Sequence, residues 1–391
     1  MTSKSFLTPL FLSFCMTISL TACGQNVEST TEKANAAINI NDSKQLRQDI
    51  GEMLLVGFRG TTIDDKSTIV RDIREYYVGS IILFEYDAPS CTRHRNIESP
   101  KQLKQLCADL QKYGNNNLLI GVDQEGGKVT RLRVNDGFPA TLTAQASAEA
   151  GDNAVEENAN TVAGELREAG INLNFAPCVD VNVNPKCPVI GKLGRSFSGN
   201  ADEVSHYARI WIALQGKKGI VSCLKHFPGH GSASGDTHAG LVDVTNTWQE
   251  KELQPYRELI AEGNIDMVMV AHVINRQFGD DLPASLSPLV VTEKLRNELG
   301  FKGVVVTDDL AMGAITKQYG FEEALKMAIL AGCDLLCLSN NGNKYDPDMV
   351  PTAVEAILEY VQDGTLNAEE IHASAERVRA LKKKMQKVSG K

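Results

Sequence analysis

Eight short apolar runs, separated by segments of helical periodicity, constrain the fold of this 391-residue chain more than any other feature. The runs are Glu52–Phe58, Gly79–Phe84, Leu118–Val122, Ile171–Val181, Ile220–Lys225, Met267–His272, Gly303–Thr307 and Asp334–Ser339. Many are nearly continuous in Val, Ile, Leu and Met, which is typical of parallel strands covered on both faces. Because there are eight strand–helix units and no long linker, the sequence predicts an α/β fold, a single (β/α)8 barrel. An open doubly wound sheet usually has fewer strands and a Gly-rich phosphate loop.

Helix signals between the runs agree with this fold. Ser99 followed by Pro100 predicts a cap and a first helical residue. Near the end of the chain, Asn367 and Glu370 resemble a capping box, and apolar residues follow along one helical face. We expect this terminal helix to close the barrel.

The first residues have the pattern of a targeting segment. Lys4 supplies a positive charge, and Phe6 to Leu20 form an apolar region too short to span a membrane. The sequence Leu20-Thr21-Ala22-Cys23-Gly24 resembles the bacterial lipobox, in which the chain is cut before Cys and the thiol carries lipid. We therefore expect a signal peptide at residues 1–22, lipidation of Cys23, and an exported protein anchored to a membrane of the cell envelope. The alternative is an ordinary signal peptide followed by an incidental Cys.

Residues 23–45 are rich in polar residues and Ala, which predicts a flexible tether, so the barrel is assigned to residues 46–391. Removing Cys15 with the signal peptide and Cys23 with the lipid leaves seven cysteines, so at least one thiol stays unpaired. The chain has no Cys-x-x-Cys pair, which argues against structural zinc.

The composition excludes some partners. With 42% hydrophobic and 23% charged residues, the chain has the balance of a folded protein with a large core. Its net charge is −9, and no stripe of Lys and Arg is interleaved with aromatic residues. Nucleic acid is therefore not an expected partner.

Polar residues follow the apolar runs at the ends where a barrel of this kind forms its active site. They are Asp123, Asp180, Lys225, His226, His272, Asp308, Asp309 and Asn340. A single Asp at a strand end is as often a helix cap as a functional group. Taken together, these residues predict a polar pocket.

The loop after the fifth run predicts an acid/base pair. Asp236 and His238 are two positions apart, so in an extended segment both side chains point the same way. The carboxylate can then orient the imidazole for proton transfer. The alternative is that the histidines and Asp236 only form hydrogen bonds within the loop.

A metal pair is a second alternative for this loop. His226 and His230 have the spacing of zinc ligands on a helix, but Pro228 and Gly229 between them argue against a helix. We therefore expect no metal and no cofactor.

The seventh run delivers a carboxylate from a rigid strand, where a covalent nucleophile is best held. A retaining glycosidase needs a nucleophile and a second group that first protonates the leaving oxygen and then activates water. Asp308 and His238 fill these roles, although most such enzymes use two carboxylates.

Six further blocks of the sequence stand out between about residues 48 and 340. They are Gly51–Phe58, Val122–Val129, Gly194–Phe197, Lys225–Gly231 followed by Asp-x-His, Ala271–Val273 and Thr307–Met312. In type and in order, these blocks resemble the barrel domain of glycoside hydrolase family 3, in its bacterial β-N-acetylglucosaminidase branch. The stretch Lys-His-Phe-Pro-Gly-His-Gly with the following Asp-x-His is highly specific for this branch.

The resemblance implies roles for nine residues. Asp308 would be the nucleophile, His238 the acid/base and Asp236 its partner, and the enzyme would remove terminal β-linked N-acetylglucosamine from peptidoglycan or chitin fragments. The sugar would be bound by Asp123, Arg131, Arg195, Lys225 and His226, with His272 nearby. Thr237, where the family usually has Ser, and Lys128, where Arg is more common, depart from the pattern without touching a chemical step.

Other functions stay open from the sequence. A family 3 β-glucosidase, or a phosphorylase that uses phosphate in place of water, fits the same blocks. An envelope lipoprotein that binds wall sugar without cleaving it is a non-enzymatic alternative, against which the joint presence of Asp308, Asp236 and His238 argues. A metal-dependent amidohydrolase would need a His-x-His on its first strand, which Glu52–Phe58 lacks.

Overall fold

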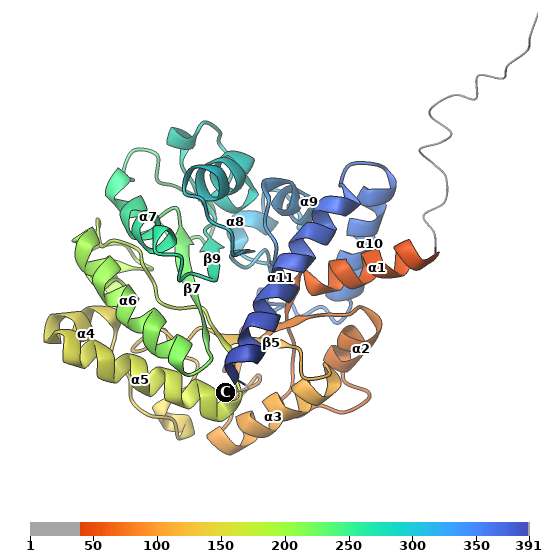
Figure 1. The fold of residues 1–391 in the computed structure, drawn as a ribbon, viewed down its shortest axis with the longest axis horizontal. Helices are drawn as coiled ribbons and strands as arrows, with labels where there is room; N and C mark the ends of the chain where they lie inside the picture. The colour runs from red at the N-terminus through yellow and green to blue at the C-terminus, as the bar shows by residue number, and fades with distance from the viewer. Residues whose placement is uncertain (1–39, 390–391) are drawn as a thin grey trace, which may run out of the picture.

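In the computed structural model, which describes residues 40–389, the chain forms a closed barrel of parallel strands surrounded by helices (Figure 1). The barrel strands are β1 (Leu54–Gly57), β2 (Ser80–Ile82), β5 (Leu119–Val122), β6 (Leu173–Asn174), β7 (Val221–Phe227), β9 (Met267–Val270), β11 (Val304–Thr307) and β12 (Leu336–Leu338). They pair in chain order, from β1 through to β11, and β12 pairs with β1. A parallel bridge between Val306 and Leu335 joins β11 to β12 and closes the ring.

Each of the eight predicted runs coincides with one barrel strand, although β7 extends two residues beyond the fifth run, and this confirms the (β/α)8 fold. The fourth run is much shorter as a strand than predicted, because β6 ends at Asn174 and the chain continues to Val181 outside the regular ladder. Pro177 has no N–H to donate, so it cannot extend a strand in the middle of a sheet. Only a single bridge, between Cys178 and Lys225, pairs this segment with β7.

Helices surround the barrel. They are α1 (Ile40–Glu52), α2 (Thr68–Glu75), α3 (Pro100–Tyr113), α4 (Ala144–Ala150), α5 (Asp152–Ala169), α6 (Ala201–Lys217), α7 (Gln254–Ala261), a π-helix (Leu289–Glu298), α8 (Gly313–Thr316), α9 (Phe321–Ala331), α10 (Met349–Gln362) and α11 (Ala368–Ser389). The predicted cap of α3 is present, since the Ser99 hydroxyl accepts a hydrogen bond from the Gln102 N–H at 3.2 Å. Short strands also pair outside the barrel: β3 (Tyr86–Asp87) with β4 (Thr92–Arg93), and β8 (Val242–Asp243) with β10 (Val273–Ile274).

Helix α11 closes the N-terminal end of the barrel, as the sequence predicts. It crosses in front of the strands in Figure 1, and its Val378 and Leu381 pack against the side chains that fill the barrel interior. The side chain of Asn367 caps the helix by accepting a hydrogen bond from the Glu369 N–H at 2.9 Å.

The first helix begins earlier than the predicted domain boundary. Residues 40–45, assigned above to the tether, lie in α1. The polar sequence around Asp42 hides this start, because the helix is fixed by partners far along the chain, such as Glu355, which pairs with Arg47 at 2.7 Å. The predicted signal peptide and Cys23 lie outside the described residues.

The seven described cysteines are free thiols, six of them buried and Cys91 exposed. The expectation of at least one unpaired thiol is therefore met. Among the helices of residues 40–389, none is long and apolar enough to cross a membrane.

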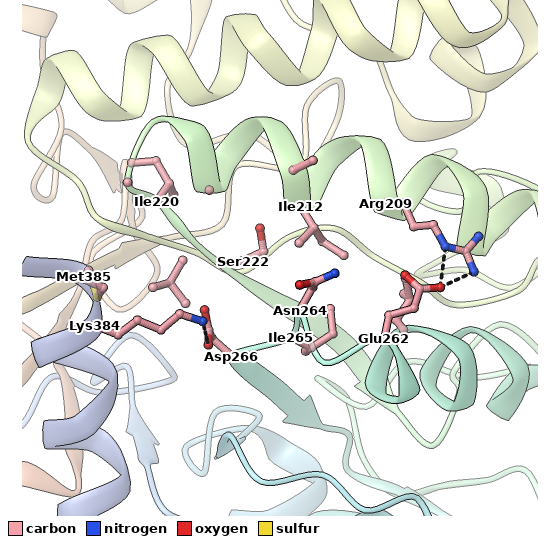
Figure 2. A pocket seen from close by; sticks show the side chains of 15 residues that line it. Arg209, Ile212, Ile220, Ser222, Glu262, Asn264, Ile265, Asp266, Lys384 and Met385 are labelled. Carbon is pink, nitrogen blue, oxygen red and sulfur yellow. Dashed lines mark hydrogen bonds and ion pairs between the residues drawn. The ribbon is translucent and has the colours of Figure 1, made fainter. Parts of the chain in front are cut away.

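A cleft of about 560 Å³ lies at the N-terminal end, between α6, α7 and α11 (Figure 2). Its charged rim residues pair with one another. The Arg209 guanidinium donates to Glu262 at 2.8 Å, and the Lys384 ammonium donates to Asp266 at 2.6 Å. None of the predicted site residues lines this cleft.

Candidate active site

The predicted site residues meet in a second cavity, of about 520 Å³, at the C-terminal ends of the strands. Those that line it are Asp123, Arg131, Arg195, Lys225, His226, Asp236, His238 and Asp308. They come from the ends of four different strands, β5, β6, β7 and β11, or from the loops that follow them, as expected for a barrel of this class. His272 does not line the cavity.

The floor of the cavity is built on Lys225, at the end of β7. Its buried ammonium lies 2.6 Å from the Asp123 carboxylate and 2.7 Å from the Glu125 carboxylate. Burial alone would lower the pKa of Lys225, but the two carboxylates outweigh it and raise that pKa. Burial would likewise raise the pKa of Asp123, yet Lys225 and Arg131 hold it well below its usual range. Lys225 and the two carboxylates, Asp123 and Glu125, are therefore charged at neutral pH.

Glu125 is a site residue that the sequence analysis missed. Arg195 donates to both of its carboxylate oxygens, at 2.8 and 2.7 Å, which is the bidentate geometry that orients a guanidinium most strictly. Arg195 also donates to the Val189 carbonyl at 2.9 Å. The only available signal was position, because Glu125 lies inside the block Val122–Val129 that follows β5.

His226 is fixed from both sides. Its Nε2 lies 3.2 Å from Arg195 Nη2, and its Nδ1 lies 2.7 Å from the Asp180 carboxylate. Because a guanidinium only donates, Nε2 must accept and Nδ1 must carry the proton that Asp180 accepts. Asp180 is buried, and it also accepts from the His230 N–H at 2.7 Å. Asp180 thus holds the start of the histidine-rich loop in place.

Arg131 lies on the side of the cavity nearest β2 and β5. Its Nη2 is 3.2 Å from Asp123, and its Nε is 3.6 Å from Glu85. Glu85 is buried and also accepts from Arg133. Sequence reasoning missed Glu85 because nothing local indicates that it meets residues more than forty positions away.

The two adjacent aspartates after β11 differ in their partners. Asp309 accepts from the N–H groups of Ala311 and Ser339, at 3.1 and 3.0 Å, and from the Ser339 hydroxyl, so it is part of the scaffold. Burial raises the pKa of Asp309 despite these bonds. Asp308 accepts only from the Asp309 N–H, at 2.8 Å, among the described residues, and its carboxylate lines the cavity.

The electrostatics keep Asp308 ionised. Burial opposes ionisation, but the polar groups around the carboxylate, among them the Asp309 N–H, outweigh it, so the pKa of Asp308 is below its ordinary value. An ionised carboxylate that is not engaged in an ion pair suits a nucleophile better than a neutral one.

His272 lies behind the cavity wall, although the sequence analysis grouped it with the sugar-binding residues. It is fully buried, and its Nε2 donates to the Asp309 carbonyl at 2.9 Å. The Ser285 hydroxyl therefore donates to Nδ1 at 2.7 Å, and burial lowers the pKa of this neutral histidine. Both ring nitrogens are occupied, so His272 supports the Asp308–Asp309 turn from behind.

Asp236 and His238 lie at the cavity mouth, in the loop between β7 and β8. The Asp236 carboxylate is 2.7 Å from His238 Nδ1 and accepts the His238 N–H at 2.9 Å, which leaves Nε2 of the imidazole free to exchange a proton. The side chains are 71% exposed for His238 and 43% for Asp236, so both are open to solvent. The loop rests on α8, where the Ala314 N–H donates to the Thr237 carbonyl at 3.2 Å.

One group of three possible metal ligands is found among the described residues: Cys178, Asp180 and His226, with ligand atoms within 4.8 Å of one another. These groups already satisfy one another. The Cys178 thiol donates to Asp180 at 3.2 Å, and burial raises its pKa well above the ordinary value, which opposes the thiolate that a metal requires. The residues therefore form a hydrogen-bonded support for His226.

A closed parallel barrel with a charged cavity at the carboxyl ends of its strands defines the class of the protein, a (β/α)8-barrel enzyme. Residues 45–381 match the family model described as "Glycosyl hydrolase family 3 N terminal domain". The chain belongs to glycoside hydrolase family 3, and it is a glycoside hydrolase.

Similar proteins include a beta-hexosaminidase of Tolumonas auensis, 36% identical over 295 residues, which cover 74% of this chain and 83% of that protein. A solved family 3 beta-N-acetylglucosaminidase from Paenibacillus sp. is 38% identical, with a TM-score of 0.78. That match covers 88% of this chain and 63% of the Paenibacillus chain. A beta-N-acetylhexosaminidase from Beutenbergia cavernae is 28% identical with a TM-score of 0.76, and the match covers 86% of this chain and 98% of that chain.

Proposed function

We propose that the protein is a retaining exo-β-N-acetylglucosaminidase that hydrolyses terminal β-linked N-acetylglucosamine. The observation that carries this proposal is that one cavity is lined both by Asp308, an ionised carboxylate without an ion-pair partner among the described residues, and by the hydrogen-bonded residues Asp236 and His238. The names of the similar proteins, beta-hexosaminidase and beta-N-acetylglucosaminidase, favour this sugar.

The chemistry takes two steps. In the first, the Asp308 carboxylate attacks the anomeric carbon while His238 donates a proton to the leaving oxygen, which gives a glycosyl ester on Asp308 and a free aglycone. In the second, His238 removes a proton from water, the water oxygen attacks the anomeric carbon, and the Asp308 carboxylate is released. Asp236 orients the imidazole and stabilises its charged form, which donates the proton in the first step and is formed again in the second.

The charged floor is suited to binding the sugar that is cleaved. Lys225 and Arg131 present donors, Asp123 presents acceptors, and the ion pairs among them hold each group in one position. Such fixed groups can bind the sugar hydroxyls and the N-acetyl group without reorganising during the reaction. Arg195 and His226 extend this wall toward the loop of His238.

A histidine acid/base also favours a second candidate function. A carboxylate base would repel an anionic acceptor, whereas a neutral imidazole does not, so phosphate in place of water would give a phosphorylase. The same glycosyl ester serves both reactions, and only the second step differs.

The test is hydrolysis of 4-nitrophenyl β-N-acetylglucosaminide by protein lacking residues 1–23, beside Asp308→Ala and His238→Ala and with phosphate varied. We expect turnover to vanish in Asp308→Ala and to fall strongly in His238→Ala. Stimulation by phosphate with release of a sugar phosphate would replace hydrolysis by phosphorolysis. Cleavage of the β-glucoside instead of the N-acetylglucosaminide would overturn the proposed sugar.

We further propose that the enzyme is exported and anchored by lipid at Cys23, where it processes peptidoglycan or chitin fragments. Support comes from the apolar segment Phe6 to Leu20 and the lipobox-like residues around Cys23. We expect the full chain to incorporate labelled fatty acid and to sediment with membranes, and Cys23→Ser to do neither. Equal labelling of Cys23→Ser would contradict the anchor.

A further inference from the structure

A hairpin between the second barrel strand and α3 forms part of the cavity mouth. Strands β3 and β4 pair antiparallel, with Tyr86 opposite Arg93 and Asp87 opposite Thr92. Tyr86 lines the same cavity as Asp308 and His238. The two proposed reaction steps make no use of this hairpin.

Buried ion pairs hold the hairpin rigidly. The Asp87 carboxylate, which is buried, accepts both donors of Arg59 at 2.9 and 2.7 Å and also pairs with the buried Arg95. Burial would raise the pKa of Asp87, but Arg59, Ser90 and Arg95 hold it well below the usual range. The carboxylate is therefore ionised, and the hairpin has a fixed charge at its base.

The loop after β12 fixes the hairpin from the other side. Asn341 accepts from the Ala88 N–H at 2.9 Å and donates to the Tyr86 carbonyl at 3.0 Å. The Tyr345 ring lies beneath the Arg59 guanidinium, 4.5 Å from the ring centroid. The backbone of Tyr86 is thus held by two elements that are distant in sequence.

The side chain of Tyr86 is nevertheless partly exposed. The residue is 41% exposed, one of six large apolar residues with such exposure among those described. An exposed aromatic ring on a rigid support inside a cavity is typical of a binding surface, because its apolar face is available without a loss of conformational freedom.

Depth in the cavity indicates what binds there. Lys225, at the floor, is 2% exposed, whereas Tyr86 lies at the mouth. If the terminal sugar of a substrate occupies the floor, the rest of the substrate extends out through the mouth. The next sugar unit then lies at the depth of Tyr86. Phe84 also lines this cavity and offers a further apolar ring.

We infer that Tyr86 forms an aglycone subsite that binds a pyranose ring, with the apolar face of the sugar stacked on the phenol ring. The inference rests on the proposed glycosidase function and adds a preference for a sugar as leaving group. Tyr86 acts on binding of the leaving unit and takes no part in proton transfer.

The test compares two substrates with the same N-acetylglucosaminyl group, using the full chain purified in detergent. One is the β-1,4-linked disaccharide of N-acetylglucosamine, which has a sugar aglycone, and the other is β-N-acetylglucosaminyl fluoride, which has none. The variants are Tyr86→Ala, Tyr86→Phe and, as a matched control, Leu330→Ala, which removes an equally exposed apolar side chain on α9, outside the cavity.

For Tyr86→Ala we expect the ratio of kcat/KM for the disaccharide to kcat/KM for the fluoride to fall about ten-fold, through a higher KM for the disaccharide. Tyr86→Phe keeps the ring and should stay near the wild-type ratio, as should Leu330→Ala. An unchanged ratio in Tyr86→Ala would overturn the subsite, and so would an equal loss on both substrates. Failure of the wild type to cleave either substrate would instead overturn the proposed function.

Discussion

The two ends of the barrel use charged residues in opposite ways. At the N-terminal end, the buried Asp334 carboxylate accepts from Arg296 at 2.5 Å, from Arg377 at 2.7 Å and from the Val305 N–H at 2.8 Å. These bonds tie the π-helix, α11 and β11 together. At the C-terminal end, the Asp308 carboxylate has no ion-pair partner among the described residues. Of these two carboxylates, the fully paired one belongs to the scaffold, and the one without an ion pair is the proposed nucleophile.

The same contrast recurs within the C-terminal end itself. Asp309 is saturated by Ser339 and Ala311, and its neighbour Asp308 is not. Position at the end of a strand therefore does not identify the reactive residue. The partners of each carboxylate separate the scaffold residue Asp309 from the proposed nucleophile Asp308.

The largest effect is expected for Asp308→Ala, which should lower kcat by about 10⁴-fold or more, because it removes the nucleophile. Its melting temperature should stay close to that of the wild type, since no ion pair is broken. Steady-state kinetics and thermal unfolding measure the two quantities. Substantial residual turnover would contradict the division of roles between the two ends of the barrel.

The opposite result is expected for Asp334→Ala. Removing this carboxylate leaves two guanidinium groups without their partner, and the free energy of unfolding should fall by about 3 kcal/mol. Activity per folded molecule should persist at low temperature, because the residue lies at the far end of the barrel. A stable but inactive Asp334→Ala would show that the two ends do not divide the roles in this way.

His238→Ala should lower kcat/KM for a sugar aglycone by about 10²- to 10⁴-fold, the usual contribution of a general acid. The loss should be smaller for the glycosyl fluoride, whose leaving group needs no proton. Comparing the two substrates separates loss of the acid from general damage to the site. Equal losses on both would argue that His238 has another role.

The smallest effect concerns Glu165 on α5, whose carboxylate accepts from Gln124 at 2.7 Å. Burial raises the pKa of Glu165 to about 8. The folded state therefore keeps its proton where the unfolded state loses it, so this group should destabilise the fold progressively as the pH rises from about 4.5 to about 8. Glu165→Gln should remove this slope, which denaturant unfolding at pH 5 and at pH 8 measures. If the free energy of unfolding falls with pH equally in the wild type and in Glu165→Gln, burial of Glu165 is not the cause of that fall.

The sequence predicts the barrel well because burial on both faces of parallel strands leaves a local pattern, the apolar run. It also predicts where the site forms, since polar residues at strand ends are local features too. It does not predict which partner each polar side chain meets. Glu125 with Arg195, and Glu85 with Arg131, are contacts between loops that only the closed ring brings together.

Two further features show the same limit. The role of His272 depends on Ser285 and on the Asp309 carbonyl, neither of which the run Met267–His272 indicates. The β3–β4 hairpin depends on Asp87 meeting Arg59 and Arg95, so the short segment before α3 gives no signal of a rigid support.

The most direct test of the central claim is to trap the glycosyl ester. The enzyme would be treated with a 5-fluoro derivative of β-N-acetylglucosaminyl fluoride, which slows release of the ester, and then measured by mass spectrometry of the intact protein and its peptides. The account predicts one added fluorinated N-acetylglucosaminyl group on the peptide that contains Asp308, with fragmentation placing it on Asp308, and none in Asp308→Asn. A label on Asp309, or turnover of the reagent with no ester at any stage, would contradict it.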